Sequence, residues 1–147
     1  MENITPTPSY PLTSSQREIW FEQQLYPTLP LYNIGGYVDL PSVIDPVLFQ
    51  QAVNLLIQKH DNLRIQLLAD TDEDGVPHQQ ILDTLGVRVP VQDLSQAPNP
   101  AAAAQDWMQT RFRTPFILTE QPLFRYDLIK LAPAAECAGK PTGALSA

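Results

Sequence analysis

The sequence contains two histidines, His60 and His78, which are the side chains best suited to move protons near neutral pH. His60 is followed at once by Asp61 and then by Arg64, an order that invites a catalytic reading. A single histidine near the end of a predicted helix is more often a capping or core-edge residue, so we assign His60 a structural role. His78 has no second ligand at metal-binding spacing, and we predict no zinc site.

The acidic stretch DTDEDG resembles the start of a calcium-binding loop, with acids at Asp70, Asp72 and Asp74. Such a loop requires a bidentate glutamate at its twelfth position, where this chain has Ile81. The flanking residues favour strands, and an Asp-Gly pair is a common hairpin turn. We therefore predict that the stretch is the tip of a β-hairpin, and we predict no metal site.

Three helices are predicted from start signals in the sequence. Thr13 and Gln16 match a capping box, in which each side chain satisfies a backbone N–H of the other residue. The other two starts pair an acceptor side chain with proline at the first helical position, where no hydrogen bond is lost. The helices expected from these signals span residues 14–25, 46–59 and 100–114. The second should bury one wide apolar face, formed by Leu48, Ala52, Leu55 or Leu56, with Phe49, Val53 and Ile57 beside them.

Strands are predicted where β-branched and aromatic residues alternate with polar ones. The segments are 31–40, 63–68, 76–82, 87–91 and 123–131. The Gly35-Gly36 pair in the first of them indicates a bulge or a close backbone approach. The order of elements predicts an α+β fold, in which helices flank one mixed sheet in an α/β sandwich around one core.

Size and composition exclude several classes of protein. The length of 147 residues is that of one domain, and a net charge of -7 disfavours binding to a phosphate backbone, so we predict no nucleic-acid partner. No apolar run reaches the about 18 residues of a membrane span, and the N-terminus lacks a secretory signal pattern, so we predict no membrane contact and a cytoplasmic location. The single cysteine, Cys137, excludes an internal disulfide.

Three stretches resemble conserved segments of the condensation domains of nonribosomal peptide synthetases. PLTSSQREIWF resembles the first core motif of that family, SxAQxRLWxL, and KHDNLRIQL resembles the second, RHExLRTxF. PFILTEQPLFR, residues 115–125, is similar to the PFDLxxxPLxR segment. The positions that match the two core motifs, to which we assign structural roles, are Thr13, Gln16, Arg17 and Trp20 in the first, and His60, Asp61, Leu63 and Arg64 in the second.

The resemblance implies a fold and an activity. Condensation domains have a chloramphenicol-acetyltransferase-like fold of two lobes, and a tunnel between the lobes admits the phosphopantetheine arms of carrier proteins. They join carrier-bound acyl and aminoacyl groups by an amide bond, with the help of an HHxxxDG motif that is absent from these 147 residues. We therefore assign no catalytic residue and no bound cofactor. The resemblance implies that Arg64 matches the family's arginine that pairs with the aspartate of HHxxxDG. Because that aspartate is absent here, we expect the guanidinium of Arg64 to be left without its partner. A buried guanidinium left alone would cost roughly 3 to 5 kcal/mol.

The resemblance also divides the chain. Residues 1–10 are expected to form a polar leader, and residues 11–131 most of an N-terminal condensation lobe. Residues 132–147 depart from the pattern and are expected to be a disordered tail, as after a truncation or a frame shift. We expect the chain to be inactive alone, with carrier proteins and the missing lobe as partners. Two alternatives are a non-catalytic remnant or interaction module, and a fragment of a coenzyme A-dependent acyltransferase.

Overall fold

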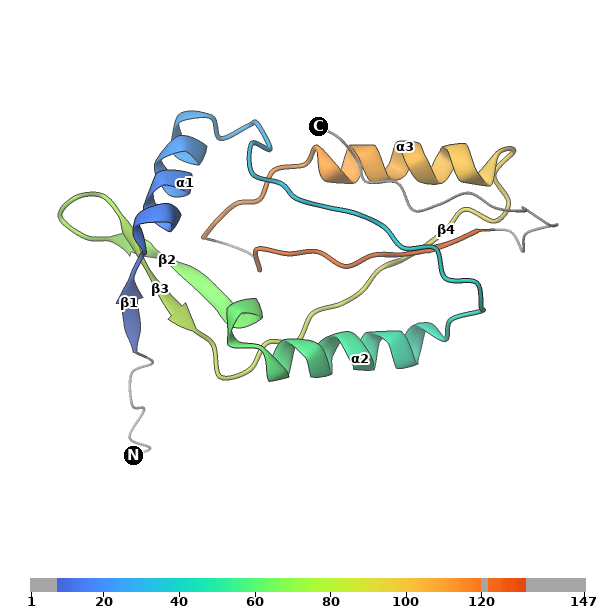
Figure 1. Ribbon diagram of the computed structural model, residues 1–147, viewed down its shortest axis with the longest axis horizontal. Helices are drawn as coiled ribbons and strands as arrows, with labels where there is room; N and C mark the ends of the chain where they lie inside the picture. Colours follow the sequence, from blue (N-terminus) through green and yellow to red (C-terminus); the bar gives the residue numbers. More distant parts are fainter. Residues whose placement is uncertain (1–7, 120–121, 132–147) are drawn as a thin grey trace.

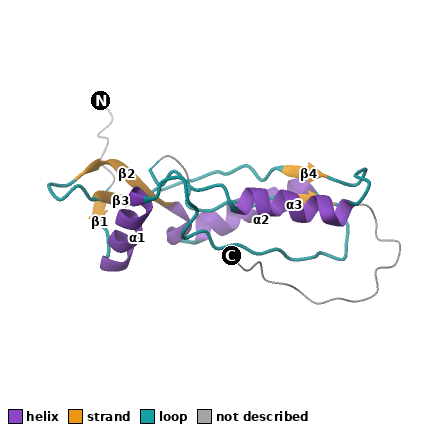
Figure 2. Cartoon of the chain, turned by 90° about the horizontal axis from the view of Figure 1, so that it is seen from above, coloured by secondary structure: helices purple, strands orange, loops and turns teal. Residues whose placement is uncertain are grey.

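The computed structural model describes residues 8–119 and 122–131 of the chain. The elements, in chain order, are β1 (Ser9–Pro11), α1 (Ser14–Leu25), α2 (Pro46–Lys59), a 3-10 helix η1 (Asp61–Arg64), β2 (Ile65–Thr71), β3 (Pro77–Ile81), β4 (Val91–Asp93), α3 (Pro100–Phe112) and β5 (Leu128–Lys130). Figure 1 shows the sheet of β1, β2 and β3, with α1, at one end of an elongated molecule. Helices α2 and α3 lie along the other end, and the view from above shows the same division (Figure 2). The predicted mixture of helices and strands is confirmed.

All three helices begin where the sequence predicts, because their start signals are local. In α2 the carboxylate of Asp45 accepts hydrogen bonds from the backbone N–H groups of Val47, at 2.7 Å, and Leu48, at 3.2 Å. In α3 the side chain of Asn99 accepts from the N–H of Ala102 at 3.1 Å. These bonds satisfy donors that have no partner inside the helix, and each cap is worth about 1 kcal/mol.

The apolar face of α2 is narrower than predicted. Val53 and Ile57 are buried and pack against Val89, whereas Leu48 and Leu55 are exposed. Only the stripe that faces residues 85–89 and the last strand is covered. The spacing of apolar residues thus predicted the helix correctly but not which part of its face would be buried.

The predicted β-hairpin is confirmed, and the acidic stretch forms its turn. Strands β2 and β3 pair antiparallel, with Ile65 opposite Ile81. The carboxylate of Asp72 accepts hydrogen bonds from the N–H groups of Asp74, at 3.0 Å, and Val76, at 2.9 Å. Gly75 has a φ of 75°, a left-handed conformation that glycine adopts without strain. The aspartate thus has a structural role, in closing the turn.

The prediction of a single sheet is wrong for the described part of the chain, which contains two. One has the order β1-β3-β2, and the other joins β4 to β5 in parallel. Strand β1 was not predicted, and it pairs Ser9 with Gln80 although Ser9 and Tyr10 fall in the expected leader. A three-residue strand carries too little pattern to be seen without its partner.

The predicted strand over residues 31–40 does not form. The segment is extended but pairs with no described strand, and Ile34 is fully exposed. It is held instead by Asn33, whose side-chain amide donates to the carbonyl oxygens of Phe112, at 2.6 Å, and Thr114, at 3.0 Å. No bulge forms at Gly35 and Gly36, and what approaches Gly35 closely is a side chain: an added Cβ would lie 3.1 Å from the Phe112 ring. A strand needs a neighbour to bond its backbone, and this segment has none here.

The strand predicted at residues 87–91 is displaced to β4, and the reason lies in α2. The side chain of Gln50 donates to the carbonyl of Val87 at 2.6 Å and accepts from the N–H of Val89 at 2.7 Å. Asn54 accepts from the N–H of Val87 at 3.1 Å. Two amides on a helix thus supply the bonds that a neighbouring strand would give. The strand predicted at 123–131 is likewise reduced to its last residues, in β5.

The end of the parallel pair carries a cluster that should respond to acid. Asp93 accepts hydrogen bonds from the Lys130 ammonium, at 2.8 Å, and from the hydroxyl and N–H of Ser95, at 2.6 and 3.0 Å. These hydrogen bonds hold the pKa of the Asp93 carboxyl far below its ordinary value, and the bond from Lys130 makes the largest contribution.

A carboxyl whose pKa is lowered by folding adds stability above its unfolded pKa, and that stability is lost as the pH falls toward the folded value. We expect the stability difference between the wild-type chain and Asp93→Asn to shrink below about pH 4, where the unfolded carboxyl protonates. Urea unfolding at pH 7 and pH 3 measures this difference in stability. Lys130→Gln should weaken the pH dependence of the wild-type stability, because it removes the strongest of the bonds to Asp93. A stability difference that does not change with pH would contradict the lowered pKa of Asp93.

Within residues 8–119 and 122–131, the interior consists of two small clusters rather than the one core predicted. Leu12, Leu67 and Val76 form the first, with Trp20 and Leu118 against it. The second centres on Val53, Ile57 and Val89. Among the described residues, seven hydrophobic side chains are buried and twenty-one large ones are exposed, which is a small interior for a chain of this length.

The described helices are all too short or too polar to cross a lipid bilayer. The tail predicted over residues 132–147, including Cys137, lies outside the described residues, as do the first seven residues of the expected leader.

Candidate functional site

The first motif-like stretch caps α1 and ties it to the sheet. Thr13 and Gln16 form the predicted capping box, with Thr13 N–H donating to the Gln16 side chain at 2.8 Å. The Gln16 amide also exchanges hydrogen bonds with the amide of Gln79 on β3, at 2.9 and 3.1 Å. Gln79 in turn donates to the carbonyl of Pro11 at 3.2 Å. The two glutamines together therefore join β1, α1 and β3, and the place of Gln16 in the capping box did not predict its bond to Gln79.

The remaining residues of this stretch divide between surface and interior. Arg17 lies 4.0 Å from the Asp74 carboxylate in the hairpin turn, and both side chains are well exposed, so the pair adds little stability. Trp20 packs on the cluster of Leu12 and Leu67. The structural role assigned to Trp20 stays a prediction.

The second motif-like stretch forms η1, which follows α2 after one residue. His60 is that residue, and it is exposed, with no side-chain hydrogen bond that caps η1. Leu63 packs on the cluster around Ile57. The structure thus places His60 at a helix junction and Leu63, half-buried, at the edge of the cluster.

Arg64 has partners in the chain itself, contrary to the expectation that its guanidinium would be left alone. It pairs with the Asp61 carboxylate and donates to the carbonyl oxygens of Leu82 and Asp83, the latter at 3.0 Å. Its side chain is only 11% exposed, and its Nε has no partner among the described residues. Asp61 precedes Arg64 by three residues on one short helix, so the spacing could have predicted the pair. Arg64 thereby fixes η1 to the end of β3.

The third stretch, residues 115–125, is anchored at its end by Arg125. The guanidinium donates to the carbonyls of Thr114 and Pro115, both at 2.9 Å, and lies 4.0 Å from the centroid of the Phe116 ring. Burial, with a smaller contribution from the like charge of Arg111, lowers the pKa of Arg125 below its ordinary value. The geometry indicates that Arg125 closes the loop onto the C-terminal end of α3.

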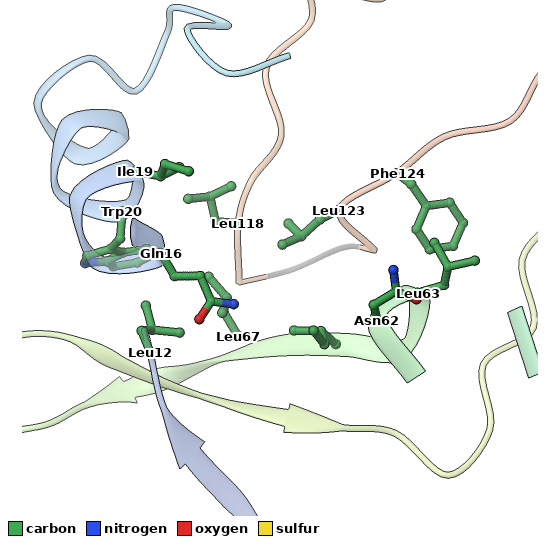
Figure 3. Close-up of a pocket in the computed structure, with 11 residues that line it drawn as sticks. Leu12, Gln16, Ile19, Trp20, Asn62, Leu63, Leu67, Leu118, Leu123 and Phe124 are labelled. Carbon is green, nitrogen blue, oxygen red and sulfur yellow. The ribbon is translucent and has the colours of Figure 1, made fainter. Parts of the chain in front are cut away.

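All three stretches meet at one cavity of about 250 Å³, between α1, β2, η1 and the loop before β5 (Figure 3). Every residue that lines the cavity belongs to one of the three stretches. The lining residues are Leu12, Gln16, Ile19, Trp20, Asn62, Leu63, Ile65, Leu67, Leu118, Leu123 and Phe124. Nine of these eleven residues are apolar and none is titratable. The lining of the cavity is mainly apolar and uncharged, and it has no side chain that could transfer a proton. Sequence reasoning missed it, although the three stretches were the ones singled out.

Metal chemistry finds no support in the part of the chain that the structure describes. No group of three or more His, Cys, Asp or Glu side chains lies close enough there to hold an ion.

Comparisons with known proteins identify the family. The condensation-domain family model matches residues 7–136, so the chain belongs to the condensation domains of nonribosomal peptide synthetases. A dimodular nonribosomal peptide synthase of Bacillus subtilis (strain 168) is 33% identical over 124 residues, and surfactin synthase subunit 1 of the same organism is 32% identical over 124 residues. The matches cover 84% and 83% of this chain but only 5% and 3% of those proteins.

A solved structure agrees with the fold. The starter condensation domain of rhizomide synthetase is 42% identical, with a TM-score of 0.78, over 87% of this chain and 30% of that chain. A variant of that domain has been solved in complex with C8-CoA. The predicted family and its chloramphenicol-acetyltransferase-like fold class are therefore confirmed.

Proposed function

We propose that this chain is the front part of a starter condensation domain, which joins an acyl group to an amino acid in the cytoplasm. The observation that carries the proposal is the 42% identity to a starter domain over most of this chain. In the reaction, the amine of an aminoacyl thioester attacks the carbonyl carbon of an acyl thioester. The new C–N bond forms, the C–S bond breaks, the thiol leaves and the nitrogen loses a proton.

The chain contributes one side of such a domain and no catalytic group. Its two histidines, His60 and His78, are not in an HHxxxDG motif, and it spans 30% of the solved starter domain. The proposed partners are therefore the remaining lobe, which brings that motif, and carrier-protein domains that present the substrates on phosphopantetheine arms. In this assembly, residues 11–131 supply the part of the domain that carries the three motif-like stretches.

The proposal is tested in a chimaera, in which residues 8–131 replace the matching part of the rhizomide synthetase starter domain. We expect the chimaera to form an amide from octanoyl-CoA and an aminoacyl thioester, as measured by thiol release and product mass. Replacing both histidines of the HHxxxDG motif with alanine should abolish the product, and the 147-residue chain alone should give none. A folded chimaera without amide formation would contradict the proposal. Supplying the acyl group on a carrier protein instead of coenzyme A distinguishes the two donor classes.

A second function, that of a non-catalytic interaction module, is favoured by the exposed apolar surface. Ile34, Val38 and Val43 are largely or fully exposed on one extended segment, and Leu48 and Leu55 on α2. Exposed patches of this kind mark surfaces that bind another protein or a missing part of the fold. Monomeric behaviour without binding of a hydrophobic dye would exclude this second function.

A further inference from the structure

We infer that the outward face of α2 binds the same face of a second copy of this chain, with the two helices antiparallel. This face consists of Leu48, Gln51, Ala52, Leu55 and Gln58, all of them exposed. Helix α2 lies along one long edge of the molecule, where nothing in the described part of the chain covers these residues (Figure 1). The surface lies outside the apolar cavity, so the inference goes beyond the proposed function.

The outward face has the spacing of a helix-packing seam. Its members recur at intervals of three and four residues, so they form one stripe along the helix. Leu48 and Leu55, which are 63% and 71% exposed, lie two turns or about 10 Å apart. The small side chain of Ala52 lies between them, and it lets the axis of a second helix approach closely.

The same helix carries a hollow that fits one protruding side chain. Gln51, Asn54, Leu55 and Gln58 line this open hollow of about 390 Å³. Their spacing, i, i+3, i+4 and i+7, is that of the four residues that receive a side chain from a facing helix in a coiled coil. One wall is fixed, because the Asn54 side chain accepts a hydrogen bond from the Val87 N–H at 3.1 Å. The hollow therefore favours a helix with a protruding apolar side chain as its occupant.

A second copy supplies such a helix in register. In a two-fold symmetric contact the same patch meets itself, so that residue i contacts residue j and j contacts i. If the axis passes between Gln51 and Ala52, Leu48 of one copy lies opposite Leu55 of the other and enters the hollow. The reverse contact forms by symmetry, so the face is complementary to itself.

The charges favour a second copy and select the antiparallel direction. Residues 46–58 contain no charged side chain, although the chain has a net charge of -7, so the repulsion between two copies is small at this helix. Interface centres are depleted in charge in the same way. In the antiparallel arrangement Lys59 lies beside Asp45 of the second copy, whereas in a parallel one it would lie beside another Lys59.

The test is sedimentation equilibrium of the 147-residue chain. The contact is small, so we expect a monomer–dimer equilibrium with a Kd of about 10–100 µM. Leu48→Ala and Leu55→Ala should each raise the Kd at least tenfold. Leu25→Ala is the matched control, because Leu25 is 74% exposed on α1, and it should leave the Kd unchanged. At about 1 µM the chain should be monomeric, and urea unfolding there reports on the monomer.

Cysteine cross-linking tests the direction of the two helices. In a Cys137→Ser background, Ala52→Cys places two thiols near the two-fold axis, and oxidised glutathione should link the chains as a disulfide dimer. Gln58→Cys places its two thiols about 20 Å apart, beyond the reach of a disulfide, and should stay unlinked. Equal cross-linking at both positions would indicate parallel helices or random encounters, and would overturn the inference.

The remaining outcomes are also decisive. A chain that stays monomeric at about 500 µM, or that forms ever larger species without a dimer plateau, would overturn the inference. Equal losses in Leu55→Ala and Leu25→Ala would show unspecific apolar adhesion and would overturn it too. The chimaera should dimerise as the chain does. If it stays monomeric while the chain dimerises, the rest of the domain covers α2 and the inference fails, but amide formation by the chimaera would still support the proposed function.

Discussion

Replacing Ile57 with alanine is expected to lower the free energy of unfolding by about 2–5 kcal/mol. Ile57 is fully buried in the cluster between α2 and Val89, so truncation removes apolar contacts and leaves a cavity. The result would be large against the 5–15 kcal/mol that stabilises a typical domain. Urea unfolding followed by circular dichroism measures it.

The control for this prediction lies two residues away on the same helix. Leu55 is 71% exposed, and Leu55→Ala should change the free energy of unfolding by less than about 0.5 kcal/mol. Equal losses in the two variants would mean that α2 is buried on a different face from the one described. A small loss in both would mean that the cluster around Ile57 is not a packed core.

Gln50→Ala is expected to cost about 2–4 kcal/mol, which is unusual for a glutamine. Its side chain is the partner of both the Val87 carbonyl and the Val89 N–H, and each partly buried backbone group that loses its partner costs about 1–3 kcal/mol. The loss should appear as a lower urea midpoint with faster amide exchange at Val89.

Two variants at neighbouring positions sharpen the prediction for Gln50. Gln50→Glu retains an acceptor for the Val89 N–H but has no donor for the Val87 carbonyl, so its loss should be intermediate. Gln51 lies one residue further on and is exposed, and Gln51→Ala should be nearly neutral. If Gln50→Ala and Gln51→Ala lose equally little, residues 87–89 do not depend on α2 for their backbone bonds.

The family explains why so many apolar side chains of the described residues are exposed. The chain spans 30% of the solved starter domain it resembles, and segment 31–40 pairs with no described strand and has apolar side chains in solvent. A two-stranded sheet such as β4-β5 is also marginal by itself. Both features are consistent with a surface that the rest of a condensation domain covers, as the proposed function requires.

Features that depend on a few neighbouring residues could be predicted from the sequence. Examples are the capping box of Thr13 and Gln16, the Asp45-Pro46 and Asn99-Pro100 starts, and the turn at Gly75, each of which acts over five residues or fewer. The family could be recognised for a similar reason, because its motifs are contiguous stretches.

Features that depend on distant partners were decided only by the tertiary structure. Residues 31–40 and 87–91 have the composition of strands, but a strand forms only where another backbone lies beside it. For residues 87–89, the side chain of Gln50 on α2 supplies the hydrogen bonds that a neighbouring strand would otherwise make. The cavity required Leu118, Leu123 and Phe124 to approach α1, about a hundred positions earlier in the chain. Hydrogen-bonded caps and turns act within one or two turns of the chain, whereas strand pairing, burial and cavities depend on which segments the whole fold brings together.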